Sequence, residues 1–107
     1  MAWYVRHLGL RPERVEGWRA GELPFPSVRL DDSLILDIIA GTPDGTGHVE
    51  HLCFVVGRSE LDAVKAAGEL AIVAEGERSG ARGMAHSIYV HDPDGLLVEL
   101  RAYPGDG

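Results

Sequence analysis

"SIYVHDPDGLLVEL", residues 87–100, contains two apolar segments joined by a run of turn-forming residues. Pro93 presets a backbone φ that suits a tight turn, and Gly95 accepts a positive φ, so residues 92–95 predict a hairpin turn. The flanking segments are rich in Ile, Val, Leu and Tyr, which is typical of strands. The stretch therefore predicts two strands joined as a hairpin near the end of the sequence.

The same pattern occurs earlier in the chain. Three pairs of segments are alike: "RAG" (19–21) and "RSG" (78–80), "SVRLDD" (27–32) and "SIYVHD" (87–92), and "LILD" (34–37) and "LLVE" (96–99). Their offsets are 59, 60 and 62 residues. A repeat at a nearly fixed period predicts two copies of one supersecondary unit.

The second half of the sequence predicts a strand, a helix and three strands. Its first strand begins at His51, and its helix begins at Ser59, a candidate N-cap residue. Leu61, Val64 and Ala67 follow with helical spacing. We expect this half to be a complete βαβββ module.

The first half predicts the same elements without the first strand. Residues 1–8 predict the last turns of a helix that Gly9 ends. Residues 13–22 predict a bent, half-exposed strand, and strands follow at 26–30 and 34–40. The counterpart of His51 would lie about eight residues before Met1. We therefore expect an incomplete module, produced either by a truncation or by a wrongly assigned start site.

The chain length of 107 residues predicts one domain. Within residues 1–107 we expect an incomplete first module at 1–41, a linker loop at 42–49 and a complete second module at 50–107. The loop interpretation depends on the Gly, Pro and Asp content of "GTPDGTG", residues 41–47.

Composition excludes several classes of partner. A formal net charge of −7 argues against nucleic acid and anionic membranes, because both require a basic surface. No apolar run approaches the ~20 residues of a membrane span, and the N-terminus does not resemble a signal peptide. The single cysteine, Cys53, cannot form an internal disulfide, which suits a reducing compartment. We expect a cytoplasmic protein.

The repeated modules resemble the vicinal oxygen chelate superfamily, which includes glyoxalase I, bleomycin-binding and fosfomycin-resistance proteins, extradiol dioxygenases and epimerases. The segments that carry the resemblance are "WYVRHLGL" (3–10), "HVEHLCFVV" (48–56), "GARGMAHSIYV" (80–90) and "DPDGLLVEL" (92–100). The chain looks most similar to the small glyoxalase-domain members. The resemblance implies an α+β fold in which tandem βαβββ modules form a cupped, mostly antiparallel sheet.

The resemblance also implies a site for Fe²⁺, Mn²⁺, Ni²⁺, Co²⁺ or Zn²⁺. Its metal ligands are a histidine from the first strand of each module and an acidic residue from the last strand. This pattern carries His51 and Glu99 onto ligand positions, and Asp37 onto the second acidic position as a ligand or base. The first-module histidine has no counterpart, and His7 does not replace it. In glyoxalase-type chemistry a ligating carboxylate, here Glu99 or Asp37, also moves a proton.

The residues themselves leave simpler interpretations open. Asp37 is equivalent to Glu99 under the repeat and lies among isoleucines, so it requires a polar partner. His51 is alternatively a strand-end residue facing water. Glu99 is alternatively one half of a solvated pair with Arg101. Cys53 is interpreted as a buried apolar residue and not as a nucleophile.

The sequence therefore favours a glyoxalase-like or dioxygenase-like enzyme that uses a divalent metal and acts on a small oxygen-rich metabolite. The alternatives are a metal-free protein that binds or sequesters a small molecule such as an antibiotic, and an inactive truncated form. We also expect a homodimer, because the absent strand would leave the apolar side chains of Trp3 and Leu8 uncovered.

Overall fold

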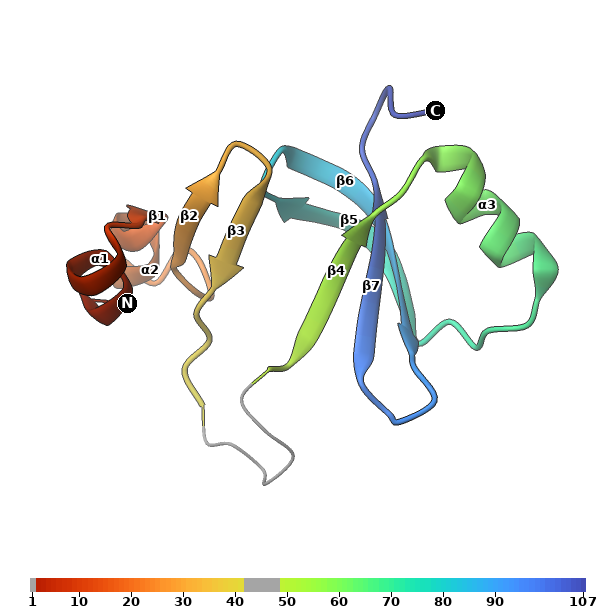
Figure 1. Ribbon diagram of the computed structural model, residues 1–107, viewed down its shortest axis with the longest axis horizontal. Helices are drawn as coiled ribbons and strands as arrows, with labels where there is room; N and C mark the ends of the chain where they lie inside the picture. The colour runs from red at the N-terminus through yellow and green to blue at the C-terminus, as the bar shows by residue number, and fades with distance from the viewer. Residues whose placement is uncertain (1, 42–48) are drawn as a thin grey trace. The chain divides into compact units, whose positions relative to one another are not determined.

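The computed structural model describes residues 2–41 and 49–107, which belong to two compact units, Met1–Pro43 and Asp44–Gly107 (Figure 1). No helix in these residues is long and apolar enough to cross a membrane. The linker predicted at 42–49 falls almost wholly outside the described residues. The predicted division into one domain of two modules stays a prediction.

The first unit contains two short helices and a three-stranded sheet. Its elements are α1 (Ala2–Leu8), β1 (Arg11–Glu13), α2 (Val15–Arg19), β2 (Ser27–Asp31) and β3 (Leu34–Asp37). The strands pair antiparallel in the order β1-β2-β3. Gly9, at φ 68°, follows α1, so the predicted helix stop is confirmed.

The strand predicted for residues 13–22 is wrong from Val15 onward, where α2 begins. Arg14, at φ 61°, leaves the extended conformation and ends β1. An ion pair between Glu16 and Arg19, three residues apart, then stabilises the single helical turn. The match of "RAG" to "RSG" also does not hold, because residues 19–21 end a helix whereas residues 78–80 lie in a strand.

The second unit has the predicted βαβββ order. Its elements are β4 (His51–Val55), α3 (Arg58–Ala67), β5 (Ala74–Gly80), β6 (Gly83–His91) and β7 (Leu97–Ala102). The sheet order is β4-β7-β6-β5, with β4 parallel to β7 and the other pairs antiparallel. Both units are therefore βαβββ-like and mostly antiparallel, and the predicted α+β fold class is confirmed.

The turn at residues 92–95 is formed as predicted. Gly95 has a φ of 88°, and the Asp92 carboxylate accepts hydrogen bonds from the backbone N–H groups of Asp94 and Leu96, both at 2.9 Å. Aspartate is common in turns because its carboxylate can accept hydrogen bonds from backbone N–H groups of the residues that follow it. The hairpin fixes the register of β6 and β7, and with it the positions of the side chains on both faces of the sheet.

Helix α3 packs on one face of this sheet. Leu61 of α3, Ile88 of β6 and Ala102 of β7 form the buried core cluster of the described residues. The predicted N-cap at Ser59 is wrong: the helix begins at Arg58, after Gly57. The backbone N–H of Ser59 instead donates to the carbonyl oxygen of Gly107 at 2.9 Å, so another backbone group satisfies the helix start.

A charged cluster joins α3 to the same face of the sheet. His86 on β6 lies between two carboxylates of β5, with Nε2 2.6 Å from Glu75 and Nδ1 3.0 Å from Glu77. Lys65 of α3 also donates to Glu75. The hydrogen bonds to Glu75 and Glu77 raise the pKa of His86, and the bonds from Lys65 and His86 lower the pKa of Glu75. Both changes favour an imidazolium bridging two ionised carboxylates.

The stability of the chain should therefore depend on the protonation of His86. A raised pKa in the folded state means that the stabilisation is complete below the unfolded value of about 6.5 and is lost as the pH rises through the folded value. A His86→Gln variant should melt below the wild type near pH 6, and the difference should shrink by about pH 9. Thermal unfolding at the two pH values measures this. His91→Gln is the control, since the His91 side chain hydrogen-bonds to the backbone carbonyl oxygen of Gly95 and to no carboxylate in the described residues. A stability difference for His86→Gln that stays constant between the two pH values would contradict the prediction.

Candidate functional site

The face of the sheet opposite α3 carries the residues that the sequence analysis selected in this unit. Cys53 of β4 lies beside Glu99 of β7, and Glu99 lies opposite Tyr89 of β6. Directly paired residues point to the same face, and so do residues two apart on one strand. His51, Glu99 and Arg101 therefore share this face with Ser87 and Tyr89.

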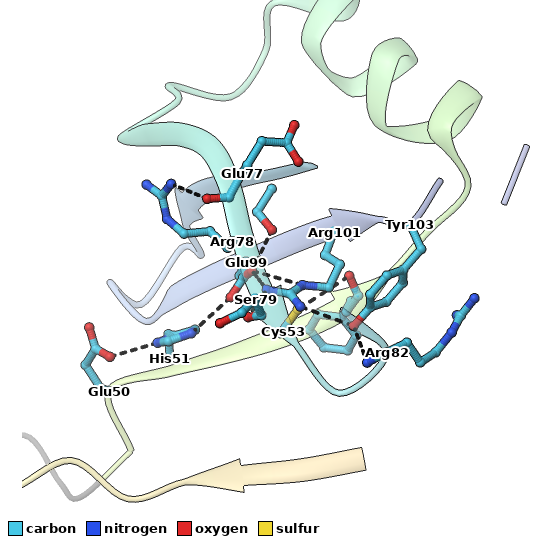
Figure 2. Close-up of polar contacts among 12 residues, drawn as sticks. Glu50, His51, Cys53, Glu77, Arg78, Ser79, Arg82, Glu99, Arg101 and Tyr103 are labelled. Atoms are coloured by element: carbon cyan, nitrogen blue, oxygen red, sulfur yellow. Dashed lines mark hydrogen bonds and ion pairs between the residues drawn. The ribbon is translucent and has the colours of Figure 1, made fainter. Parts of the chain in front are cut away.

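The carboxylate of Glu99 is buried and is held by several donors (Figure 2). Its Oε2 accepts hydrogen bonds from Ser87 Oγ at 2.6 Å and from Arg101 Nη2 and Nε at 2.8 and 3.2 Å. Burial alone would raise the pKa of Glu99, but the hydrogen bonds from Ser87 and Arg101 outweigh it and hold the pKa below its ordinary value. The group is therefore an ionised carboxylate.

The other oxygen of Glu99 faces His51. Oε1 lies 3.1 Å from His51 Nε2, while His51 Nδ1 lies 2.8 Å from the carboxylate of Glu50 (Figure 2). The ring of Tyr89 meets the His51 ring edge-on, with centroids 5.7 Å apart. His51 is thus positioned by three neighbours, and the alternative that it only faces water is wrong.

Arg101 is buried beside Glu99. Its Nη1 donates to the hydroxyl of Tyr103 at 3.1 Å, and its Nη2 donates to the carbonyl oxygen of Ser79 at 3.0 Å. Glu99 and Arg101 have relative exposures of 3% and 5%, so the alternative of a solvated surface pair is wrong. Burial would lower the pKa of Arg101, but the bonds to Tyr103 and Glu99 raise it. The pair is a fixed, buried salt bridge.

Asp37 in the first unit has the polar partner that its position requires. Ser27 Oγ donates to Asp37 Oδ1 at 2.6 Å, as Ser87 donates to Glu99. The two acidic residues that are equivalent under the repeat therefore share one local arrangement. That Asp37 joins His51 and Glu99 at one site stays a prediction.

Cys53 differs from its predicted environment, because it is exposed and not buried. Strand β4 lies at the edge of the sheet, where apolar neighbours such as Leu52 and Phe54 are also exposed. Partial desolvation of the thiol, with the nearby Glu99 carboxylate, raises the pKa of Cys53 to about 11. The group is therefore a thiol at neutral pH, and that Cys53 is not a nucleophile stays a prediction.

His51 and Glu99 have the chemistry and spacing of two metal ligands. Imidazole nitrogen and carboxylate oxygen bind divalent metals at about 2.0–2.2 Å, so two atoms 3.1 Å apart can reach one ion. In residues 2–41 and 49–107, no group of three or more His, Cys, Asp and Glu side chains is arranged so that it could hold a metal ion. The described part of the chain therefore places two donor atoms, and not three, at a spacing that one metal ion could bridge.

Ser87 and Tyr89 lie at the candidate site although neither was predicted there from the sequence. Ser87 was detectable, because the repeat aligns it with Ser27 and each serine precedes the acidic strand of its module. Tyr89 lies two residues from Ser87 and so shares its face, which strand alternation indicates. Neither the repeat nor strand alternation predicts that Ser87 and Tyr89 contact His51 or Glu99.

Comparison with known proteins identifies relatives for part of the chain. No protein-family model matches it. It is 49% identical over 57 residues to the glyoxalase domain-containing protein RDO1 of Mycosarcoma maydis, covering 50% of this chain and 32% of that protein. It is 42% identical over 55 residues to virulence protein STM3117 of Salmonella typhimurium, covering 49% and 38% of the two. The chain therefore spans about a third of the length of the curated relatives it matches.

Solved structures show weaker likeness over more of the chain. The crystal structure of the Salmonella typhimurium virulence protein has a TM-score of 0.44 and 23% identity, covering 94% of this chain and 82% of that one. A glyoxalase/dioxygenase from Nostoc punctiforme has a TM-score of 0.41 and 22% identity, covering 95% and 80%.

Proposed function

Because this chain belongs to the glyoxalase, or vicinal oxygen chelate, superfamily, we propose that it binds a divalent metal through His51 and Glu99 and acts on a small oxygen-rich metabolite. The observation that carries the proposal is the 3.1 Å contact between His51 Nε2 and Glu99 Oε1. Ser87 and Arg101 occupy Oε2, so Oε1 is the oxygen left for a ligand role.

We propose different tasks for the two acidic residues, because their carboxylates are held by different donors. A carboxylate whose pKa is lowered is a good ligand and a weak base, so Glu99 suits metal binding better than proton abstraction. Asp37, which has a single serine donor in the described residues, is proposed as the base or as a further ligand. A bound metal would act as a Lewis acid that stabilises negative charge on substrate oxygens.

The test is metal binding by the intact chain. Titration calorimetry with Mn²⁺, Ni²⁺ and Zn²⁺ should detect one site, and His51→Ala should weaken it at least about tenfold, as loss of a ligand or its supporting partner does. His86→Ala is the matched control, because His86 also lies between two carboxylates but on the other face of the sheet. Equal affinity in the wild type and His51→Ala, or weakening only in His86→Ala, would show that the proposal is wrong.

A metal-free binding protein of the same fold is the second candidate. It is favoured by the Arg101 guanidinium, which already neutralises Glu99 and reduces the charge available to a metal. A folded wild-type chain that binds none of the three metals would support this candidate over the first.

The homodimer also stays a proposal. Leu52 and Phe54 are exposed apolar side chains on one face of the edge strand β4, and they give a surface that a second copy would cover. Light scattering measures the molecular mass in solution directly. A stable monomer at micromolar concentration would count against the homodimer.

A further inference from the structure

Arg78 of β5 lies on the same face of the sheet as the candidate site. It is paired with Ala85 in the antiparallel register, and Gly76, two residues before it, is paired with Ser87, the donor to Glu99. The guanidinium carbon of Arg78 lies 5.7 Å from the centroid of the Tyr89 ring. The side chain therefore turns back along β5 toward Tyr89, which in turn contacts His51.

Gly76 provides the space for this path. A Cβ at position 76 would lie 2.6 Å from Arg78 Nη1 and 3.5 Å from its Cζ. The guanidinium thus occupies the volume that a side chain at position 76 would fill. Arg78 of β5 lies over the ring of Tyr89 of β6, and Tyr89 contacts His51 of β4. The three side chains therefore form a row on this face of the sheet.

Arg78 differs in its pairing from the other two arginines near it. Arg101 is bound to Glu99, and Arg82 is bound to both oxygens of Asp106. Arg78 has no carboxylate partner among the hydrogen bonds of the described residues: it donates to the backbone carbonyl oxygen of Glu77, at 3.0 Å, and to the side chain of Tyr89. A guanidinium has five N–H donors, so most of those on Arg78 are available to a ligand.

We propose that Arg78 binds an oxyanion of the substrate, a carboxylate or a phosphate, and so selects anionic metabolites at the site of His51 and Glu99. A planar guanidinium pairs with both oxyanions through two parallel hydrogen bonds. In a chain with a net charge of −7, a local cation is needed for an anion to bind next to Glu99. That the bound oxyanion belongs to a substrate of His51 and Glu99 rests on the proposed function. Oxyanion binding by Arg78 does not depend on it.

The test uses two probes, malonate and inorganic phosphate, titrated separately into the full chain and followed by backbone amide NMR. The wild type should show saturable shifts around Arg78 and Tyr89 with at least one probe, and the probe that binds distinguishes a carboxylate from a phosphate site. Arg78→Ala should weaken binding about tenfold, the loss expected for charge-assisted hydrogen bonds, and Arg78→Lys should keep part of the affinity. Arg78→Gln, which keeps a polar side chain, replaces Arg78→Ala if that variant fails to fold.

Two controls separate this proposal from others. Arg58→Ala removes an exposed arginine of α3, which packs on the other face, and should leave binding unchanged. His51→Ala should lose metal affinity and retain the probe, so the two proposals can fail independently. An affinity unchanged in Arg78→Ala, a loss in Arg58→Ala instead, or no binding of either probe by the wild type would overturn the proposal.

Discussion

A Gly80→Ala variant is expected to unfold at a much lower temperature than the wild type. A Cβ at position 80 would lie 1.4 Å from Arg101 Nη1, 2.5 Å from its Cζ and 2.9 Å from the Tyr103 hydroxyl. Arg101 cannot move aside cheaply, since it is buried and bound to Glu99, Tyr103 and Ser79. Displacing it leaves the charge of Glu99 buried without its partner, which costs about 3–5 kcal/mol. We expect a melting temperature more than about 10 °C lower, given the small size of the unit.

Gly41→Ala is the control for this experiment. No atom of residues 2–41 and 49–107 lies within 4 Å of a Cβ built at Gly41, and its backbone is not in the left-handed region. Its effect on the free energy of unfolding should stay within about 0.5 kcal/mol. Circular dichroism during heating and in urea measures both variants. A Gly80→Ala variant as stable as Gly41→Ala would show that the Arg101 guanidinium is free to leave its position.

Arg101→Met is the second substitution for which we expect a large effect. Methionine keeps much of the apolar volume of the arginine stem but leaves the buried Glu99 carboxylate without its guanidinium partner, although Ser87 and His51 still contact it. Removing one partner of a buried ion pair destabilises proteins by about 3–5 kcal/mol. Urea unfolding at neutral pH should show a loss of this size.

The double variant Arg101→Met with Glu99→Leu tests the cause. Replacing both charges of a buried pair by apolar groups is often neutral or even stabilising, because no charge then remains desolvated. The double variant should therefore regain most of the stability lost in Arg101→Met. If it is less stable than Arg101→Met, lost packing and not the unpaired charge explains the first result.

Local chemistry made the second unit predictable from its sequence. The hairpin turn at 92–95 depends on Pro93 and Gly95, whose backbone preferences act without tertiary contacts. Strand alternation then places Glu99 and Arg101 on one face of β7. The sequence alone therefore brings together two residues of the candidate site and predicts the strands that carry them.

Other features depend on contacts that sequence patterns do not report. Five residues of mixed polarity, Val15–Arg19, form α2 after Arg14 adopts a left-handed backbone, and no periodicity can be read over so short a segment. The helix start at Arg58 is satisfied by a carbonyl distant in sequence. The burial of Glu99 with Arg101 and the exposure of Cys53 both depend on which strand lies at the edge of the sheet.

The parallel pairing of β4 with β7 affects the order in which the candidate site is assembled. His51 and Leu97 are adjacent in space but separated by 46 residues (97 minus 51), whereas the strands β5, β6 and β7 pair through short connections. Closing a long loop costs more chain entropy, so local hairpins tend to form before distant pairings. Glu99, Ser87 and Arg101 can therefore meet on the three-stranded meander first, and His51 arrives when β4 docks. Strand β4 lies at the edge of this sheet and most of its side chains are exposed, so local opening of β4 would uncover the Glu99 carboxylate, and access to that carboxylate is coupled to the local stability of β4.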